Sequence, residues 1–206
     1  MFKHPVIVFE GVETSGKTTN LNIVKNYLKK KNIKYLDFRE PGGTSFSEKL
    51  RKLLLNKKTR SNPKTDLLLM LASRSENFHK LIKKNYRKKV ILIDRFSDST
   101  IAYQHYGMNL NLNLIHQLNK FIIGNLKPDL TILSLVNTIN LKKRLLNRKK
   151  LDRYDNFNFK FYKKVQIGFN KLANKKKNYL IIDSNKNSIE KNKNIIIKKL
   201  ENIIQI

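Results

Sequence analysis

The stretch VIVFEGVETSGKTTN, residues 6–20, constrains the fold more than any other part of the chain. An apolar run leads into a loop that matches the phosphate-binding pattern G-x-x-x-x-G-K-[ST], with Gly11, Gly16, Lys17 and Thr18 at its fixed positions. Glycines let backbone N–H groups turn toward phosphate oxygens, and the start of the following helix adds partial positive charge. A strand before this loop and a helix after it therefore predict a domain that binds ATP or GTP.

The length of the chain favours one domain. With 206 residues it can bury one sizeable α/β core but not two, so we expect a single domain over residues 1–206. It has no cysteine, which excludes disulfides and thiol chemistry. No apolar run approaches the roughly 20 residues of a membrane span, and the first residues lack a signal-peptide pattern. We expect a soluble cytoplasmic protein without a membrane partner.

The formal net charge of +29 has two interpretations. It could be the electrostatic footprint of a nucleic-acid-binding protein. However, lysines are spread through nearly all predicted helices, and Lys, Asn and Ile crowd every region, as A+T-rich codon usage would produce. We favour this compositional explanation and expect no dedicated nucleic-acid partner, although a positive field would help to recruit phosphorylated small molecules.

Short apolar segments alternate with segments of helical periodicity, which is the pattern of βαβ units on a mostly parallel sheet. Strands are predicted at residues 5–10, 33–38, 90–94, 130–136 and 178–183. Helices are predicted at 18–30, 47–55, 61–84, 97–104 and 112–123, with a last amphipathic helix near the C-terminus. Between the last two strands, residues 141–155 are rich in arginine and poor in expected core residues.

A second anion site is predicted at the end of the third strand, where Arg95 follows Asp94. An acid at this place beside a phosphate loop suits Mg²⁺ or its waters, so Thr18 and Asp94 are the predicted metal ligands. Arg95 would present its donors at the carboxyl end of the sheet, where ligands bind in open α/β folds. GTPase motifs are missing, so these residues indicate a kinase whose second substrate carries a phosphate.

Six segments, in order along the chain, carry a family resemblance: FEGVETSGKTT, REPGGT, EKLRKLLL, DRFSDSTIAYQ, LKPDLTILSLV and RLLNRKKLDR. Together they resemble bacterial thymidylate kinases (dTMP kinases) over essentially the whole chain. The resemblance implies an α/β fold of three αβα layers, the P-loop NTPase fold, with a central five-stranded parallel sheet. It also implies a homodimer that transfers the γ-phosphate of ATP to dTMP with Mg²⁺, a step of dTTP biosynthesis.

The resemblance implies a role for each residue of the site. The predicted ATP-binding residues are Gly11, Val12, Glu13, Thr14, Ser15, Gly16, Lys17, Thr18, Thr19, Arg144 and Arg148. The predicted dTMP-binding residues are Glu13, Arg39, Arg51, Met70, Arg74, Arg95, Ser99, Thr100, Tyr103 and Gln104. Within this set, Arg95, Arg39 and Arg51 would bind the phosphate. Arg74, Thr100 and Gln104 would bind the thymine ring, and Tyr103 would close against the sugar.

The catalytic residues implied by the family are Lys17, Arg95, Arg148, Glu13 and Arg153. No arginine stands at loop positions 12–15, so the chain resembles the members that supply the catalytic arginine from a mobile lid, here residues 142–155. Arg148 is the first candidate for contact with the transferred phosphate and Arg153 the second. Glu13 is expected to face the sugar of the acceptor or the water shell of the metal.

Met70 stands where the family usually has a phenylalanine under the thymine ring. Methionine can pack against an aromatic face but gives up about 0.5–1.5 kcal/mol of ring stacking, so we expect weaker dTMP binding. This change leaves open a kinase for another nucleoside or deoxynucleoside monophosphate. A basic nucleic-acid-binding P-loop ATPase is the alternative from a different class.

Overall fold

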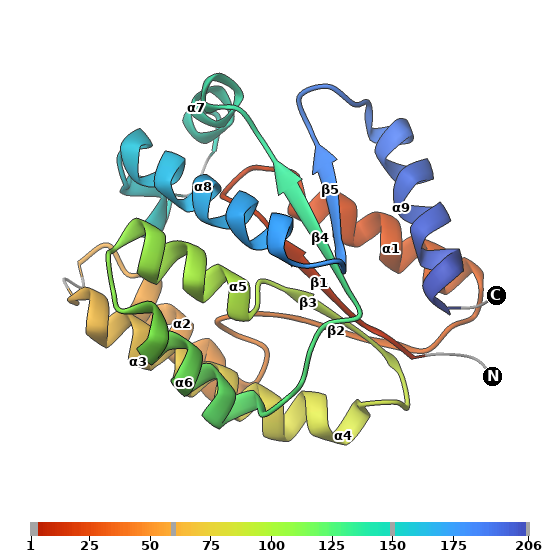
Figure 1. The fold of residues 1–206 in the computed structure, drawn as a ribbon, viewed down its shortest axis with the longest axis horizontal. Coiled ribbons are helices and arrows are strands. Elements are labelled where there is room, and N and C mark those ends of the chain that lie inside the picture. The colour runs from red at the N-terminus through yellow and green to blue at the C-terminus, as the bar shows by residue number, and fades with distance from the viewer. Residues whose placement is uncertain (1–3, 59–60, 149–150, 205–206) are drawn as a thin grey trace.

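Five parallel strands form the centre of the fold, in the order β2-β3-β1-β4-β5. The computed structural model describes residues 4–58, 61–148 and 151–204 (Figure 1). The strands are β1 (Val6–Glu10), β2 (Tyr35–Arg39), β3 (Val90–Asp94), β4 (Leu130–Leu135) and β5 (Tyr179–Asp183). The central strand β1 pairs with β3 and β4, and all of its residues are buried, as expected for a parallel strand covered on both faces.

Helices cover both faces of this sheet. They are α1 (Lys17–Lys30), α2 (Ser45–Leu55), α3 (Pro63–Asn77), α4 (Lys83–Asn85), α5 (Ser97–Thr100), α6 (Leu112–Ile123), α7 (Thr138–Leu146), α8 (Phe159–Lys175) and α9 (Ile189–Ile204). Two π-helical turns, η1 (Phe78–Ile82) and η2 (Ile101–Gly107), and one 3₁₀ turn, η3 (Tyr154–Asn156), extend or link them. In the described ranges, no helix combines the length and apolarity needed to cross a lipid bilayer.

The layers follow from the apolar faces of the helices. Side chains of α1 and α9, such as Val24 and Leu200, pack with Ile7 and Phe9 of β1 against one face of the sheet. The opposite face is covered by α3, α6 and α8, together with α2, which packs on α3 (Figure 1). The predicted fold class, three αβα layers around a five-stranded parallel sheet, is confirmed.

Most predicted elements are found within two residues of their expected ends. The long helix of residues 61–84 is a continuous run of α3, η1 and α4 that begins at Pro63. Its cap is Asn62, whose side-chain oxygen accepts a hydrogen bond from the Thr65 N–H at 3.0 Å. Local start signals of this kind are readable because they depend only on neighbours in the sequence.

The region after β4 differs from the prediction. Residues 141–155 are not poor in core residues, because Leu141, Leu145 and Tyr154 are all buried. Sequence reasoning also missed α8 as a helix, although Phe161, Val165 and other residues at helical spacing form its buried face. Residues 149–150 of the predicted lid lie outside the described residues.

Helix α8 holds the helical run of α5 and η2 in place through two glycine contacts. A Cβ atom built on Gly168 would lie 2.6 Å from the Tyr106 ring, and one on Gly107 would lie 2.5 Å from the Phe161 ring. These distances are shorter than any ordinary van der Waals contact, so α8 and η2 can approach this closely only with glycine at both places.

We expect Gly168→Val to destabilise the protein by about 1–3 kcal/mol, because the added methyl groups force α8 away from Tyr106. Urea unfolding would measure the change. The control is Asn170→Val, which places the same side chain at an exposed position of α8. Equal stability of the two variants would contradict the close contact.

Candidate active site

The phosphate loop joins the end of β1 to the start of α1. Gly11 has φ 139°, and a Cβ there would lie 2.4 Å from the Ser134 carbonyl oxygen, so only glycine fits. The Lys17 ammonium donates to the Val12 carbonyl at 2.8 Å and lies within the loop. Burial, followed by the positive charge of Arg95, lowers the Lys17 pKa to about 8. An anionic ligand would offset both effects.

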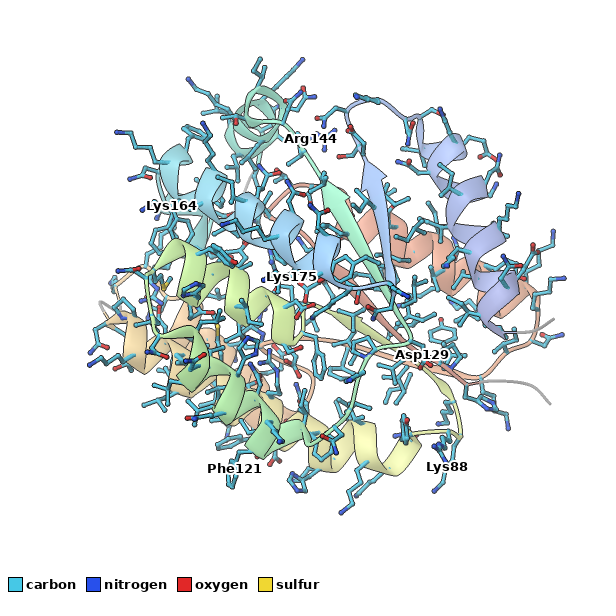
Figure 2. All side chains as sticks on the ribbon, viewed as in Figure 1. Lys88, Phe121, Asp129, Arg144, Lys164 and Lys175 are labelled. Carbon is cyan, nitrogen blue, oxygen red and sulfur yellow. The ribbon has the colours of Figure 1, made fainter. Side chains whose placement is uncertain are left out.

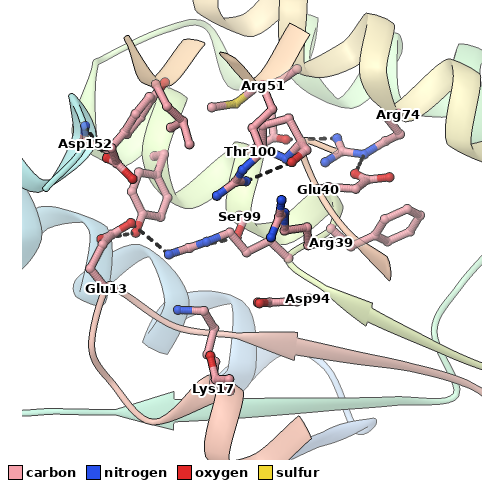
Figure 3. Close-up of a pocket in the computed structure, with 18 of the residues that line it drawn as sticks. Glu13, Lys17, Arg39, Glu40, Arg51, Arg74, Asp94, Ser99, Thr100 and Asp152 are labelled. Carbon is pink, nitrogen blue, oxygen red and sulfur yellow. Dashed lines mark hydrogen bonds and ion pairs between the residues drawn. The ribbon is translucent and has the colours of Figure 1, made fainter. Parts of the chain in front are cut away.

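One cavity of about 460 Å³ opens beside this loop (Figure 3). It brings together most of the predicted site residues: Glu13, Thr14, Lys17, Thr18, Arg39, Arg51, Met70, Arg74, Asp94, Arg95, Ser99, Thr100, Tyr103, Gln104 and Arg148. Figure 3 shows Lys17 and Asp94 on one side of this space and Arg39 and Arg51 reaching toward it from another. Residues from the phosphate loop and from β2, α2, α3 and η2 thus converge on one volume, as a site for two substrates requires.

The other predicted residues do not line this cavity. Gly11, Val12, Ser15 and Gly16 shape the loop, and Thr19 is exposed on α1. Arg144 of α7 lies against the loop, where its guanidinium donates to the Thr14 carbonyl at 3.0 Å and to the Ser184 carbonyl at 3.2 Å. Arg153 is bound instead to Ser61 and Asp66 near the start of α3.

Arg95 connects the loop to the part of the cavity wall that carries Tyr103. Its guanidinium donates to Glu13 Oε1 at 2.8 Å and to the Gly11 carbonyl at 2.9 Å. The Tyr103 hydroxyl donates to the other Glu13 oxygen at 2.6 Å. Arg95 has φ 69°, a strained conformation for a side chain of this size, held by these contacts. Glu13 therefore fixes both Arg95 and Tyr103.

Three arginines line the cavity near one another, and only two of them form ion pairs among the described residues. Arg39 pairs with Glu48 at 3.1 Å, and Arg95 pairs with Glu13. Arg51 donates only to the uncharged Pro41 carbonyl, at 2.8 Å, among the contacts of the described residues. The Arg51 pKa is lowered first by burial and then by the charges of Arg39 and Arg95. This cluster is suited to a doubly charged phosphate.

Arg74 lies at the far end of the cavity and is almost fully buried. Its Nε donates to Glu40 at 2.7 Å, and its Nη1 donates to Thr100 at 2.9 Å and to Asn119 at 2.7 Å. Glu40 is itself buried, and burial raises its pKa. Sequence reasoning missed Glu40 and Asn119. The motif REPGGT contained a signal for Glu40, since an acid in a buried turn needs a cationic partner.

Glu10, the last residue of β1, is a buried residue beside the site that sequence reasoning missed. It is fully buried and accepts hydrogen bonds from the Phe96 N–H at 3.0 Å and the Ser99 N–H at 3.1 Å. It also accepts one from the Ser99 hydroxyl. Burial, together with the charge of Asp98, raises the Glu10 pKa to about 7. Glu10 therefore holds the start of the helical run that carries Thr100, Tyr103 and Gln104.

The predicted metal ligands fit Mg²⁺ at the edge of this cavity. Thr18 and Asp94 both line it, and Asp94 Oδ1 is buried without a hydrogen-bond partner among the described residues. Among those residues, no group of three or more His, Cys, Asp and Glu side chains could hold a metal ion. Two protein ligands are enough for Mg²⁺ when waters and substrate phosphates complete its shell.

A phosphate loop that shares one cavity with an arginine cluster defines a P-loop kinase for a phosphorylated small molecule. The comparisons with known proteins narrow this class. The family model described as thymidylate kinase matches residues 9–196. The thymidylate kinase of Thermosipho africanus is 39% identical over 199 residues, which cover 95% of this chain and 98% of that protein. That of Mesoplasma florum is 39% identical over 202 residues, covering 95% of this chain and 96% of that protein.

A solved structure agrees with the sequence comparisons. The crystal structure of thymidylate kinase from Ehrlichia chaffeensis superposes with a TM-score of 0.79 at 33% identity, covering 97% of this chain and 99% of that chain. The chain belongs to the thymidylate kinase family. The prediction of a nucleoside monophosphate kinase, a phosphotransferase, is confirmed.

We expect Glu10 to make stability depend on pH. Between its ordinary pKa of 4.5 and its folded pKa of about 7, the unfolded chain has lost the Glu10 proton while the folded chain keeps it. Stability should therefore fall as pH rises through this window, by about 3 kcal/mol. Glu10→Gln mimics the protonated acid and should remove this fall, as measured by urea unfolding at about pH 5 and about pH 7.5. The matched control is Glu190→Gln at an exposed pair, and parallel pH curves for wild type and Glu10→Gln would contradict the assignment.

Proposed function

We propose that this chain transfers the γ-phosphate of ATP to dTMP, giving dTDP and ADP. The observation that carries the proposal is the single cavity that joins Lys17 of the phosphate loop to the cluster of Arg39, Arg51 and Arg95. A donor site and a second anion site in one volume suit transfer between two phosphates. Membership of the thymidylate kinase family supports dTMP as the acceptor.

For this reaction the protein has mainly to align the two substrates and to neutralise the charge of their phosphates. A phosphate monoester is already an anionic nucleophile, so no strong general base is needed. In this proposal the loop N–H groups and Lys17 hold the phosphates of ATP, and Arg95 holds the attacking phosphate against them. Mg²⁺ held by Thr18 and Asp94 would neutralise charge on the donor phosphates.

Glu13 acts in this proposal on the acceptor side. Its carboxylate already binds Arg95 and the Tyr103 hydroxyl, so the phosphate contact and the sugar edge are set by the same group. One face of the side chain also lines the cavity, where the sugar hydroxyl or the water shell of the metal would lie. The acid in the phosphate loop thus serves the acceptor while backbone groups serve the donor.

Arg148 is the lid arginine that we assign to the transferred phosphate. It lines the cavity and is paired with the buried carboxylate of Asp155, and its side chain is 39% exposed. Such a pair orients the guanidinium before the substrates bind, which is the requirement for transition-state stabilisation. Arg144, against the back of the loop, would support the ATP-binding conformation.

The residues that we assign to the base of the acceptor are compatible with more than one nucleoside monophosphate. Arg74, fixed by Glu40 and Thr100, and Gln104, whose buried Oε1 has no hydrogen-bond partner among the described residues, supply donors and an acceptor for a pyrimidine ring. Met70 also lines the cavity, at the position where the family usually has a phenylalanine. A related monophosphate therefore stays the alternative acceptor.

A substrate panel tests the proposal. We expect the purified chain with Mg²⁺ and ATP to release ADP fastest with dTMP, more slowly with dUMP, and little with UMP or AMP. Lys17→Met should reduce dTMP turnover by at least ~10³-fold, because the donor phosphates lose their charged partner. A coupled ADP assay, run with and without single-stranded DNA, measures all arms. ATP hydrolysis that requires DNA and ignores dTMP would instead support the nucleic-acid-binding alternative.

Two further expectations concern the surroundings of the enzyme. Lysine side chains extend from well-separated parts of the fold, such as Lys88 before β3 and Lys164 and Lys175 on α8 (Figure 2). This spread supports the compositional explanation of the charge, and the absence of a nucleic-acid partner stays a prediction. A cytoplasmic location likewise stays a prediction.

We also propose that the chain is a homodimer through the outer faces of α2, α3 and α6. Large apolar side chains are exposed on each of these helices: Leu53 on α2, Leu68 on α3, and Leu114 and Phe121 on α6. Phe121 is 88% exposed and points away from the body of the molecule (Figure 2). Because α3 packs against both α2 and α6, these side chains belong to one side of the fold, and covering them would remove apolar surface from water.

We expect Phe121→Glu to shift the protein from dimer to monomer, because a carboxylate would be buried at the contact. Light scattering after size-exclusion chromatography would measure the mass. The control is Ile189→Glu, an equally drastic change at an exposed position of α9 across the sheet, which should leave the dimer intact. A dimer that survives Phe121→Glu would place the contact elsewhere.

A further inference from the structure

Arg153 is held outside the cavity by a compact set of contacts near the start of α3. Its Nη1 donates to the Ser61 hydroxyl at 2.7 Å, and its Nη2 forms an ion pair with Asp66 Oδ2. The Tyr154 hydroxyl donates to the same Asp66 oxygen at 3.1 Å, and the Ser61 hydroxyl donates to Oδ1 at 2.6 Å. Both carboxylate oxygens of Asp66 are therefore satisfied by this set.

The burial of Asp66 makes this contact strong. Asp66 is 2% exposed and lies in the first turn of α3, where the helix dipole favours a negative charge. A buried carboxylate without a cation is costly, so Asp66 requires Arg153 or a substitute for it. The Arg153 N–H also donates to the Leu55 carbonyl at the end of α2, at 3.1 Å. The segment around Arg153 is thereby tied to both α2 and α3.

Asp66 stands on the helix that carries the base site. Met70 and Arg74 follow it at intervals of four residues, so the three side chains lie along one face of α3. Met70 and Arg74 line the cavity, and Asp66 is the next position toward the start of the helix. One face of α3 therefore joins Asp66 to two residues that line the cavity.

Hydrogen bonds also connect the segment around Arg153 to Arg148. Asp155 pairs with Arg148 and accepts a hydrogen bond from the Asp152 N–H at 2.8 Å. The Asp152 carboxylate in turn accepts from the N–H groups of Tyr154 at 2.8 Å and of Asp155 at 3.2 Å. The turn that holds Arg148 is thus continuous with the residues that bind Asp66.

We propose that Asp66 and Arg153 form a clamp that positions Arg148, so that Arg153 acts through Arg148 and does not contact the transferred phosphate itself. The inference rests on the proposed function and adds a positioning role for two residues. Through the clamp, the helix that binds the acceptor base sets the place of the lid arginine on the donor side. A displacement of about 1 Å at such a group can cost ~10²-fold in rate.

A double-mutant cycle tests the clamp. We expect Asp66→Asn to lower kcat for dTMP phosphorylation by ~10- to 100-fold with a smaller change in KM for ATP, because Arg148 loses its position. In an Arg148→Ala background the same substitution should lower kcat by less than about 2-fold, because the group it positions is gone. Full additivity of the two substitutions in kcat would overturn the proposal, and so would an unchanged kcat in Asp66→Asn alone.

Substitution of Arg153, the other residue of the pair, distinguishes a clamp from a catalytic role of Arg153. Arg153→Gln should behave like Asp66→Asn and should likewise be silent in the Arg148→Ala background. A further large loss of kcat from Arg153→Gln in that background would assign Arg153 to the phosphate and overturn the clamp. If Asp66→Asn does not fold, Ser61→Ala replaces it, because it removes the Ser61 hydroxyl that contacts both Asp66 and Arg153. The double-mutant cycle with Arg148→Ala is then made with Ser61→Ala and with Arg153→Gln.

Hydrogen exchange supplies a readout that does not depend on turnover. Asp66→Asn should increase amide exchange at residues 151–156 and leave α1 and α9 unchanged, whereas unchanged exchange at residues 151–156 would contradict the clamp. Asp37→Asn, which breaks the partly exposed pair of Asp37 with Lys25, is the matched control and should combine additively with Arg148→Ala. Wild-type turnover of dTMP is measured first. Its absence would count against the proposed function, whereas turnover with an additive cycle would count against the clamp alone.

Discussion

The ion pair between Glu13 and Arg95 is the interaction on which the rest of the site depends. It joins a phosphate loop built at the end of β1 to a residue that follows β3, so that the loop and the arginine cluster share one wall of the cavity. The parallel sheet makes this contact possible, since Phe9 of β1 pairs with Asp94 of β3 and the Arg95 N–H donates to the Phe9 carbonyl at 2.9 Å. The strain at Arg95 is stabilised by this contact and by the bond to Gly11.

Carboxylates hold most of the arginines in and around the cavity in place. The chain has 15 acidic residues against 44 lysines and arginines. Against this excess, most arginines in and around the cavity have a carboxylate of their own: Arg39 with Glu48, Arg74 with Glu40, Arg95 with Glu13, Arg148 with Asp155 and Arg153 with Asp66. These five acids therefore hold guanidinium groups in fixed directions. Some lysines also pair with acids, such as Lys25 with Asp37 and Lys176 with Asp98, but the lysine side chains of these pairs are at least partly exposed.

The parts of the fold that could be predicted from the sequence depend on local patterns. The strand before Gly11, the helix start at Pro63 and the strand that ends at Asp94 all follow from residues next to one another. The partners of the arginines could not be predicted, because Glu40 and Asp66 lie tens of residues from Arg74 and Arg153, and the sequence offers many basic residues for few acids. Helix α8 was missed for a related reason. Aromatic residues crowd its first turns and obscure the spacing of the buried face.

Two cations that line the cavity, Arg51 and Lys17, form no ion pair among the described residues, which suits the cavity to anionic ligands. Arg51 has only a carbonyl partner among the described residues, and the charges of Arg39 and Arg95 lower its pKa in addition to burial. Lys17 likewise donates to a carbonyl, that of Val12, and burial, followed by the charge of Arg95, lowers its pKa. A neutral ligand would leave these repulsions in place, whereas phosphates on both sides would relieve them. Because the guanidinium groups with carboxylate partners are already oriented, the binding energy of an anionic ligand would not be spent on arranging them.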